Sequence, residues 1–142
     1  MTDSALDRTC EKYGCAKRYL DPKLHEFDDC FGGRIRMGDI DAAVERNGHI
    51  LWVEWKRGAV LEHFEKQFAA QWFQAVAFTK NNPNQTFVFV VGDPVTMTIE
   101  QFRPVSGGGW QYPSWFQGAD RFKSFLRHWY SIADQSREAA NA

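Results

Sequence analysis

The dipeptide Asn47-Gly48 separates two stretches with the residue types of β-strands, Arg34 to Arg46 and His49 to Lys56. Asn and Gly tolerate the positive φ angles of a two-residue hairpin turn better than other residues, so this arrangement predicts two antiparallel strands. A two-residue turn also fixes the register of the hairpin, because Arg46 must then pair with His49. Every further pair follows from that first one.

The register brings four charged residues onto one face of the predicted hairpin. Asp41 is expected directly opposite Glu54, and Asp39 directly opposite Lys56, with Cβ atoms roughly 4.5–5.5 Å apart. Side chains alternate along a strand, so both pairs point to the same side. Two opposed carboxylates repel each other, and a divalent cation would compensate that repulsion. Mg²⁺ or Mn²⁺ suits such ligands, and Lys56 would then steady the attacking water or the charge on a phosphate.

The rest of the chain predicts an α/β fold with a mixed sheet flanked by helices, in a single domain that spans residues 1–142. Ile50 to Val53 are all apolar, which places the second hairpin strand inside the sheet with both faces covered. A helix between that strand and the apolar strand Phe87 to Val91 implies that these two strands are parallel. The predicted helices are Asp3 to Leu20, Gly58 to Lys80 and Ala119 to Asp134, and Thr96 to Val105 is predicted as an edge strand closed by Pro104.

The segments Gly38-Asp39-Ile40-Asp41 and Val53-Glu54-Trp55-Lys56 together resemble the signature of the PD-(D/E)xK nuclease superfamily. The resemblance implies a restriction-endonuclease-like fold in which Asp41 and Glu54 hold the metal ion and Lys56 is the catalytic lysine. The family name has Pro before the first acid, where this chain has Gly38 or Ile40. Many members also supply a Glu from the first helix, for which Glu26 is preferred here over Glu11. A solvated surface acid explains Glu26 at least as well.

The function that follows is hydrolysis of phosphodiester bonds with Mg²⁺ or Mn²⁺, with DNA favoured over RNA as the substrate. The alternative is a catalytically inactive module on the same fold that binds nucleic acid or protein. Asp39, Asp41, Glu54 and Lys56 could also be ordinary ion-pairing residues of a solvated sheet face. A homodimer or a larger protein partner could supply additional grip on the substrate.

Two further groups of polar residues are candidates for contact with the site or with the substrate. Gln67, Gln71 and Gln74 form a stripe on the helix after the motif, and some relatives place a Gln there, so Gln71 is a secondary candidate. A solvated helix face explains the same stripe. The net charge is only −1, so binding of phosphates must depend on local groups of basic residues. The candidates are Arg34, Arg36, Arg57, Arg121, Lys123, Arg127 and His128.

Three cysteines and one histidine near the N-terminus have the ligand types of a structural zinc site. Cys10, Cys15, His25 and Cys30 are the four residues. The spacing between the first two cysteines is unusual for zinc, and both lie within a predicted helix, so buried thiols are the preferred reading. An odd number of cysteines in a chain without a secretion signal argues against a disulfide framework.

Membrane association is not expected from the sequence. No apolar run approaches the length needed to span a bilayer. The first residues, Met1 to Ser4, are polar and acidic where a signal peptide would be basic and then apolar. We therefore expect a soluble, intracellular protein of the cytoplasm.

Overall fold

A computed structural model describes residues 29–32 and 40–141, with side chains up to Ser136. The chain divides into two units, residues 1–39 and 40–142, so the single domain expected from the sequence stays a prediction. In the first unit, residues 29–31 form a 3-10 turn that ends at Gly32, where φ is +74°. The predicted helix Asp3 to Leu20 lies outside the described residues. All elements below belong to the second unit.

The predicted hairpin is present, with strands β1 (Ala42–Arg46) and β2 (His49–Lys56). Asn47 and Gly48 have φ angles of +53° and +83°, as a two-residue turn of this kind requires. Arg46 pairs with His49 and the ladder runs on to the pair of Ala42 with Val53, so the predicted register is confirmed. The ladder ends one pair before Asp41, which lies in a bend.

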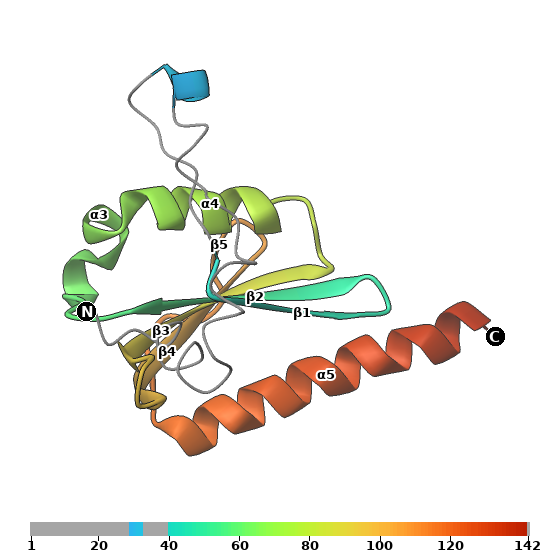
Figure 1. The fold of residues 1–142 in the computed structure, drawn as a ribbon. Coiled ribbons are helices and arrows are strands. Elements are labelled where there is room, and N and C mark those ends of the chain that lie inside the picture. The colour runs from blue at the N-terminus through green and yellow to red at the C-terminus, as the bar shows by residue number, and fades with distance from the viewer. Residues whose placement is uncertain (1–28, 33–39, 142) are drawn as a thin grey trace, which may run out of the picture. The chain divides into compact units, whose positions relative to one another are not determined.

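The sheet is mixed, as the sequence predicts. Strand β3 (Gln85–Asp93) is parallel to β2, and β4 (Thr98–Ser106) is antiparallel to β3. Two short strands, β5 (Gly109–Trp110) and β6 (Phe116–Gln117), both pair with β4, which makes six strands among the described residues. The parallel pairing of β2 and β3 follows from the helical crossover between them (Figure 1).

Strand β4 corrects one prediction, since it is neither an edge strand nor closed by Pro104. Its second side pairs with β6 at residues 101–102 and with β5 at residues 105–106. The carbonyl oxygen of Pro104 accepts a hydrogen bond from the backbone N–H of Gln111. The N–H that proline lacks would also point to that side, away from β3, so Pro104 leaves the β3 ladder intact.

The helix predicted over residues 58–80 is in fact three shorter pieces. These are η2 (Leu61–His63), α3 (Phe64–Gln67) and α4 (Ala69–Thr79). Gly58 has a φ of +61°, which excludes it from a right-handed helix. Phe68 interrupts the helix with φ −119° and ψ 49°. Helical spacing of apolar residues continues through the break, so the sequence pattern does not reveal it.

Helices cover both faces of the sheet. On one face, Phe64 and Ala75 from α3 and α4 pack with Phe87, Phe89, Val91 and Val105. On the other, Phe122 from α5 (Ala119–Asn141) packs with Leu51, Val53, Val88, Val90 and Phe102. Figure 1 shows α4 and α5 on opposite sides of the strands. None of the helices in the described ranges is long and apolar enough to cross a membrane.

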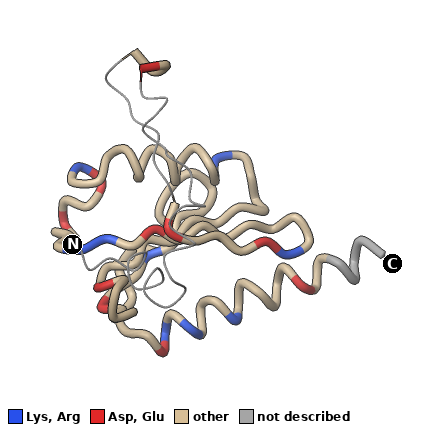
Figure 2. The backbone as a smooth tube through the Cα atoms, viewed as in Figure 1, with Lys and Arg blue, Asp and Glu red and all other residues tan. Residues whose placement is uncertain are grey.

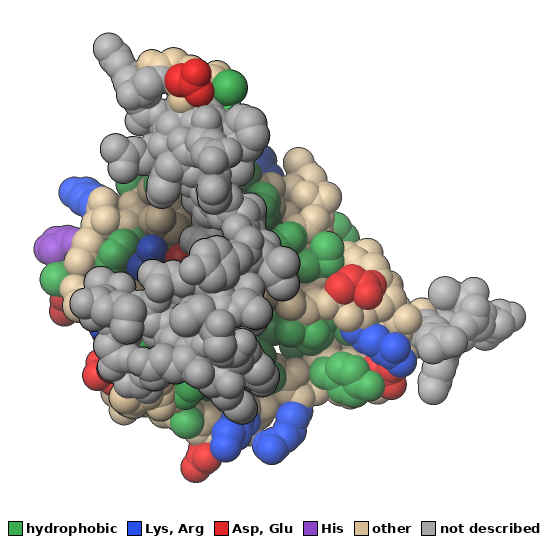
Figure 3. Space-filling view, viewed as in Figure 1, with side chains coloured by type: hydrophobic (Ala, Val, Ile, Leu, Met, Phe, Trp, Pro, Cys, Tyr) green, Lys and Arg blue, Asp and Glu red, His purple; other side chains and the backbone are tan. Residues whose placement is uncertain are grey.

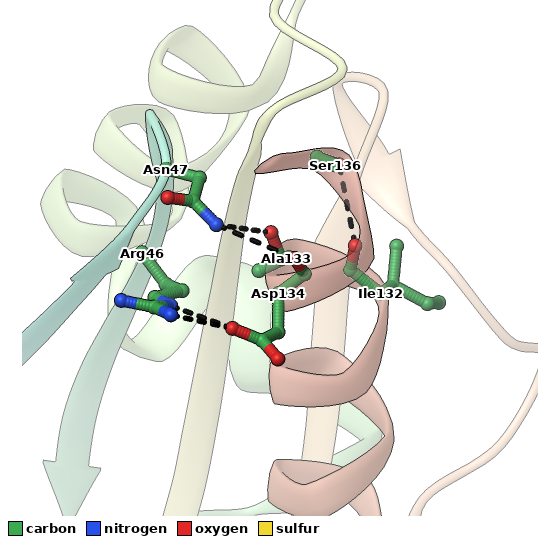
Figure 4. Close-up of polar contacts among 6 residues, drawn as sticks. All are labelled: Arg46, Asn47, Ile132, Ala133, Asp134 and Ser136. Carbon is green, nitrogen blue, oxygen red and sulfur yellow. Dashed lines mark hydrogen bonds and ion pairs between the residues drawn. The ribbon is translucent and has the colours of Figure 1, made fainter. Parts of the chain in front are cut away.

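The hairpin turn is fastened to α5 by side chains at its tip. Arg46 donates from Nε and Nη2 to Asp134 Oδ1, at 2.9 Å and 2.6 Å, and Asn47 Nδ2 donates to the carbonyl oxygen of Ala133 at 3.1 Å (Figure 4). The hydrogen bond with Asp134 raises the pKa of Arg46. Figure 3 shows hydrophobic side chains beside charged ones on the surface. The exposed large hydrophobic residues of β1 and α5 are Val44, Tyr130 and Ile132.

Gly92 is required where β3 meets β4. The register shifts between Val91 and Gly92, and a Cβ added at Gly92 would lie 2.0 Å from the carbonyl oxygen of Thr98. Gly92→Ala must displace backbone, so we expect it to lower the free energy of unfolding by at least about 2 kcal/mol. Gly109→Ala is the matched control, because a Cβ there meets no atom within 4 Å among the neighbours considered. Urea unfolding followed by tryptophan fluorescence measures both, and equal midpoints would contradict the prediction.

Candidate active site

Glu54 and Lys56 point toward the α3 and α4 side of the sheet. Trp52 packs on that side and Trp55 packs on the α5 side, so alternation along β2 places Glu54 and Lys56 with Trp52. Their partners on the parallel strand are Phe89 and Val91. Glu54 is only 7% exposed, which is rare for a carboxylate and requires compensating charge or hydrogen bonds.

Lys56 supplies that charge at short range. Its Nζ atom lies 3.3 Å from Glu54 Oε1. The side chain of Lys56 is 17% exposed, and the side chain of Glu54, counted without its backbone, is 9% exposed. The same Nζ lies 5.0 Å from the centre of the Phe68 ring, an arrangement in which the ring face attracts the cation. The ammonium group is thus held between a buried carboxylate and an aromatic ring, in a position set by β2 and by the helix break at Phe68.

Asp41 lies against the same strand through a backbone contact. Its Oδ2 accepts a hydrogen bond from the N–H of Trp55 at 2.5 Å. Trp55 stands between Glu54 and Lys56, so this contact brings the carboxyl group of Asp41 to the motif strand. The predicted strand pair of Asp41 with Glu54 is not formed, because the ladder ends at the pair of Ala42 with Val53. Asp41 itself is exposed, and its second oxygen has no hydrogen bond among those recorded for the described residues.

The other predicted site residues are only partly placed. Asp39 and Glu26 lie outside the described residues. Within the described ranges there is no cluster of three or more His, Cys, Asp or Glu side chains that could hold a metal ion. Gln71 is half-buried on α4, three residues beyond Phe68. The part of the site that is described therefore consists of Asp41, Glu54 and Lys56.

The predicted glutamine stripe is not continuous. Gln67 belongs to α3 and Gln71 to α4, with the break at Phe68 between them. The Gln67 side chain accepts a hydrogen bond from the N–H of Val60 at 2.7 Å and donates one to the carbonyl oxygen of Gly58 at 3.0 Å. Gln67 therefore fixes the loop that follows the motif.

Arg57, the next residue after the motif, is held by an acid from β3. It forms an ion pair and a hydrogen bond with Asp93. The hydrogen bond from the N–H of Val95 is the main cause that lowers the pKa of Asp93, and Arg57 lowers it further. Both residues line a cavity of about 230 Å³ together with Gly58 and Glu100. A phosphate contact by Arg57 would have to compete with Asp93.

Two features of this site could not be found in the sequence motif. The aromatic contact of Lys56 depends on Phe68, which the apolar periodicity assigns to a helix interior. The hydrogen bond from Trp55 to Asp41 uses a backbone N–H, which no residue type signals. Only the hairpin register, which places residue 41 beside residue 54, indicated that Asp41 would be close to this strand.

The predicted zinc ligands are not tested by the structure. Cys30 is exposed, and its Sγ lies 3.9 Å from Asp29 Oδ1. Cys10, Cys15 and His25 lie outside the described residues. Zinc binding by these four residues remains a prediction.

Comparison with known proteins gives no relative for this chain. No known protein family, no curated protein and no solved structure matches it. Any assignment of family or activity therefore depends on the motif and on the geometry of the residues around β2.

Proposed function

We propose that this chain is a metal-dependent nuclease of the PD-(D/E)xK superfamily that hydrolyses phosphodiester bonds, preferably in DNA. The observation that carries the proposal is the buried pair of Glu54 and Lys56 on β2, with the carboxyl group of Asp41 held against the same strand. Buried, paired charges beside an exposed carboxylate are more common at functional sites than on solvated sheet faces.

The order of elements supports the same proposal. A hairpin, a helical crossover and a strand parallel to the motif strand follow one another from β1 to β3. The resemblance implies a core of a helix, three strands, a helix and a fourth strand, and the elements from β1 to β3 would correspond to its last four. In such a fold the acids stand on the hairpin and the lysine stands two residues after the second acid, as Asp41, Glu54 and Lys56 do in this sequence.

The donor groups fit a hard divalent cation. Asp41 and Glu54 offer carboxylate oxygens, and Mg²⁺ in phosphoryl-transfer sites is often bound by one or two carboxylates together with waters and substrate phosphates. A bound Mg²⁺ or Mn²⁺ supplies Lewis-acid polarisation of the phosphate and an activated water. Glu54 would hold the ion with a buried carboxylate and Asp41 with an exposed one.

Lys56 has the role of a positioned cation. Its ammonium group is restricted by Glu54 and by the Phe68 ring, so little conformational entropy remains to be lost when a phosphate binds. A preorganised positive charge in a partly buried site stabilises the negative charge that develops on the phosphate oxygens. A lysine on an exposed strand would provide much less, because water screens it.

Incubation with labelled duplex, single-stranded, flap and junction DNA, and with RNA, tests this function in Mg²⁺, Mn²⁺ and EDTA. We expect cleavage of DNA with either metal and none in EDTA. Asp41→Asn should lower the rate about a hundredfold, because a metal-binding charge is lost. It should leave the melting temperature almost unchanged, because the amide oxygen can still accept the hydrogen bond from Trp55.

Other outcomes of this experiment identify the alternatives. Binding of DNA without cleavage in either metal would favour an inactive binding module on the same fold. If Asp41→Asn cleaves DNA as fast as the wild type does, the role of Asp41 is only structural, through its hydrogen bond with Trp55. An unfolded Asp41→Asn would give the same conclusion about Asp41, and Glu54 variants would then decide the site.

A further inference from the structure

A groove on the opposite face of the sheet from Glu54 is lined by aromatic rings. It contains a cavity of about 280 Å³, and we name it the aromatic groove; the lining residues that matter below are Phe102, Tyr112, Phe116, Arg121, Phe125 and His128. Phe102 comes from β4, Tyr112 from the loop between β5 and β6, and the last three from α5. Phe102 is buried and belongs to the core cluster on the α5 side.

The aromatic rings of the groove contact one another. The Phe102 ring stacks on Phe116 with centroids 5.4 Å apart, and it lies 5.7 Å from Phe125. Tyr112 meets Phe116 edge to face at 5.2 Å and is 39% exposed. Its loop is fastened by Arg103, which donates from Nε and Nη2 to the carbonyl oxygen of Tyr112. The exposed Tyr112 ring is therefore held in place at the edge of an apolar cavity.

Among the described residues that line this groove, Arg121 carries a positive charge. The Arg121 guanidinium lies 5.5 Å from the centre of the Phe116 ring. His128 lies seven residues further along α5 and lines the same cavity, as two helical turns require. None of the described residues that line the cavity is Asp or Glu, although the whole chain is slightly acidic. The Lys and Arg residues of α5 are blue in Figure 2.

A second compartment continues the aromatic groove toward the hairpin. It has a volume of about 200 Å³ and shares Tyr112, Phe125 and His128 with the first. Its other lining residues include the polar side chains His49, Thr86, Ser106 and Gln111, and within the described part of the chain no acid lines it. Together the two compartments reach the size range of small-ligand sites, about 300–1,000 Å³. The two compartments therefore share an aromatic boundary, and the second adds polar side chains.

We propose that the aromatic groove binds a single strand of nucleic acid. Flat rings offer the faces of unpaired bases a stacking surface, and Arg121 provides a cation for the phosphate backbone. A duplex hides its base faces inside the stack, so it cannot use these rings. The second compartment shares Tyr112 and Phe125 with the first, so we expect it to accommodate the next nucleotide of the strand. This site does not depend on the proposed nuclease activity.

Fluorescence anisotropy with a labelled oligo-dT strand of about 12 nucleotides, in EDTA, tests the proposal on the full chain. We expect the strand to bind more tightly than a duplex of equal length. Tyr112→Ala should weaken binding about tenfold, through loss of one stacking ring. Arg121→Gln should weaken it too, and should reduce the slope of log K against log salt concentration by about 0.7.

Matched controls separate stacking from general surface effects. Tyr112→Phe keeps the ring and should bind as the wild type does. Tyr130→Ala removes an exposed aromatic ring from α5 outside both compartments, and it should also bind normally. Equal urea midpoints for Tyr112→Ala and Tyr130→Ala establish that both fold.

Four results would overturn the proposal. The first is that oligo-dT does not bind, and the second is that Tyr112→Ala binds it as tightly as the wild type does. The third is that strand and duplex bind with equal affinity and that each variant weakens both to the same extent. The fourth is that dTMP displaces the strand at concentrations near the Kd of the strand. The last would identify a pocket for a free nucleotide. If Tyr112→Ala does not fold, the affinity and salt slope of Arg121→Gln decide.

Discussion

Glu54→Gln is expected to lower the rate of metal-dependent DNA cleavage by about a thousandfold and to remove most of the affinity for Mn²⁺. The substitution keeps the size of the side chain and removes the anionic oxygen that a hard cation needs. Glu54 is only 7% exposed, so a water molecule cannot easily take the place of the lost carboxylate oxygen as a ligand of the ion. Single-turnover cleavage assays and titration calorimetry with Mn²⁺ measure the two effects.

Glu45→Gln is the matched control for this prediction. Glu45 is an exposed acid on β1, and its Oε2 accepts a hydrogen bond from the N–H of Gly48 in the hairpin turn. The amide of Gln can still accept that bond, so cleavage and Mn²⁺ affinity should both match the wild type. If Glu54→Gln retains cleavage, Glu54 is a partner of Lys56 in a structural ion pair and the proposed site is wrong.

Lys56→Met should abolish cleavage while leaving Mn²⁺ binding in place. It also removes the ammonium group 3.3 Å from the buried carboxylate of Glu54. Breaking a buried ion pair from one side is costly, so we expect the free energy of unfolding in EDTA to fall by about 3 kcal/mol. Mn²⁺ should then stabilise Lys56→Met more than it stabilises the wild type, because the metal ion takes over the charge that Lys56 supplied.

The double variant Glu54→Gln/Lys56→Met completes this test. Both charges are absent, so its stability should return close to that of the wild type and should not respond to Mn²⁺. Thermal unfolding of the four proteins with Mn²⁺ or EDTA gives the comparison. Lys56→Met that is stabilised by Mn²⁺ no more than the wild type would contradict a metal site beside Glu54.

The sheet was predictable because its signals are local and strong. Asn47-Gly48 determines the hairpin and its register, and the apolar residues at both parities of β2 and β3 reflect packing against helices on two faces. The short strands β5 and β6 have two residues each, too few to produce an alternating pattern. The same limit explains why β4 was expected at an edge.

The break in the helix at Phe68 and the partners of the site residues could not be predicted from the sequence. Phe68 leaves the helical conformation without a Gly or Pro, so tertiary packing rather than local propensity determines its backbone. Lys56 and Asp41 then find their partners, the Phe68 ring and the Trp55 N–H, through that packing and through the hairpin register. The motif residues could be named from the sequence, but the groups that hold them could not.

The contacts between the hairpin tip and α5 have a consequence for how the molecule is made. Arg46 and Asp134 are 88 positions apart, so this bond forms only after a long loop has closed. On the ribosome, α5 is the last described element to emerge, after every strand of the sheet. Until it arrives, Leu51 and Val53 on the back of the motif strand lack their covering layer, and a partly made chain exposes an apolar sheet face that favours aggregation.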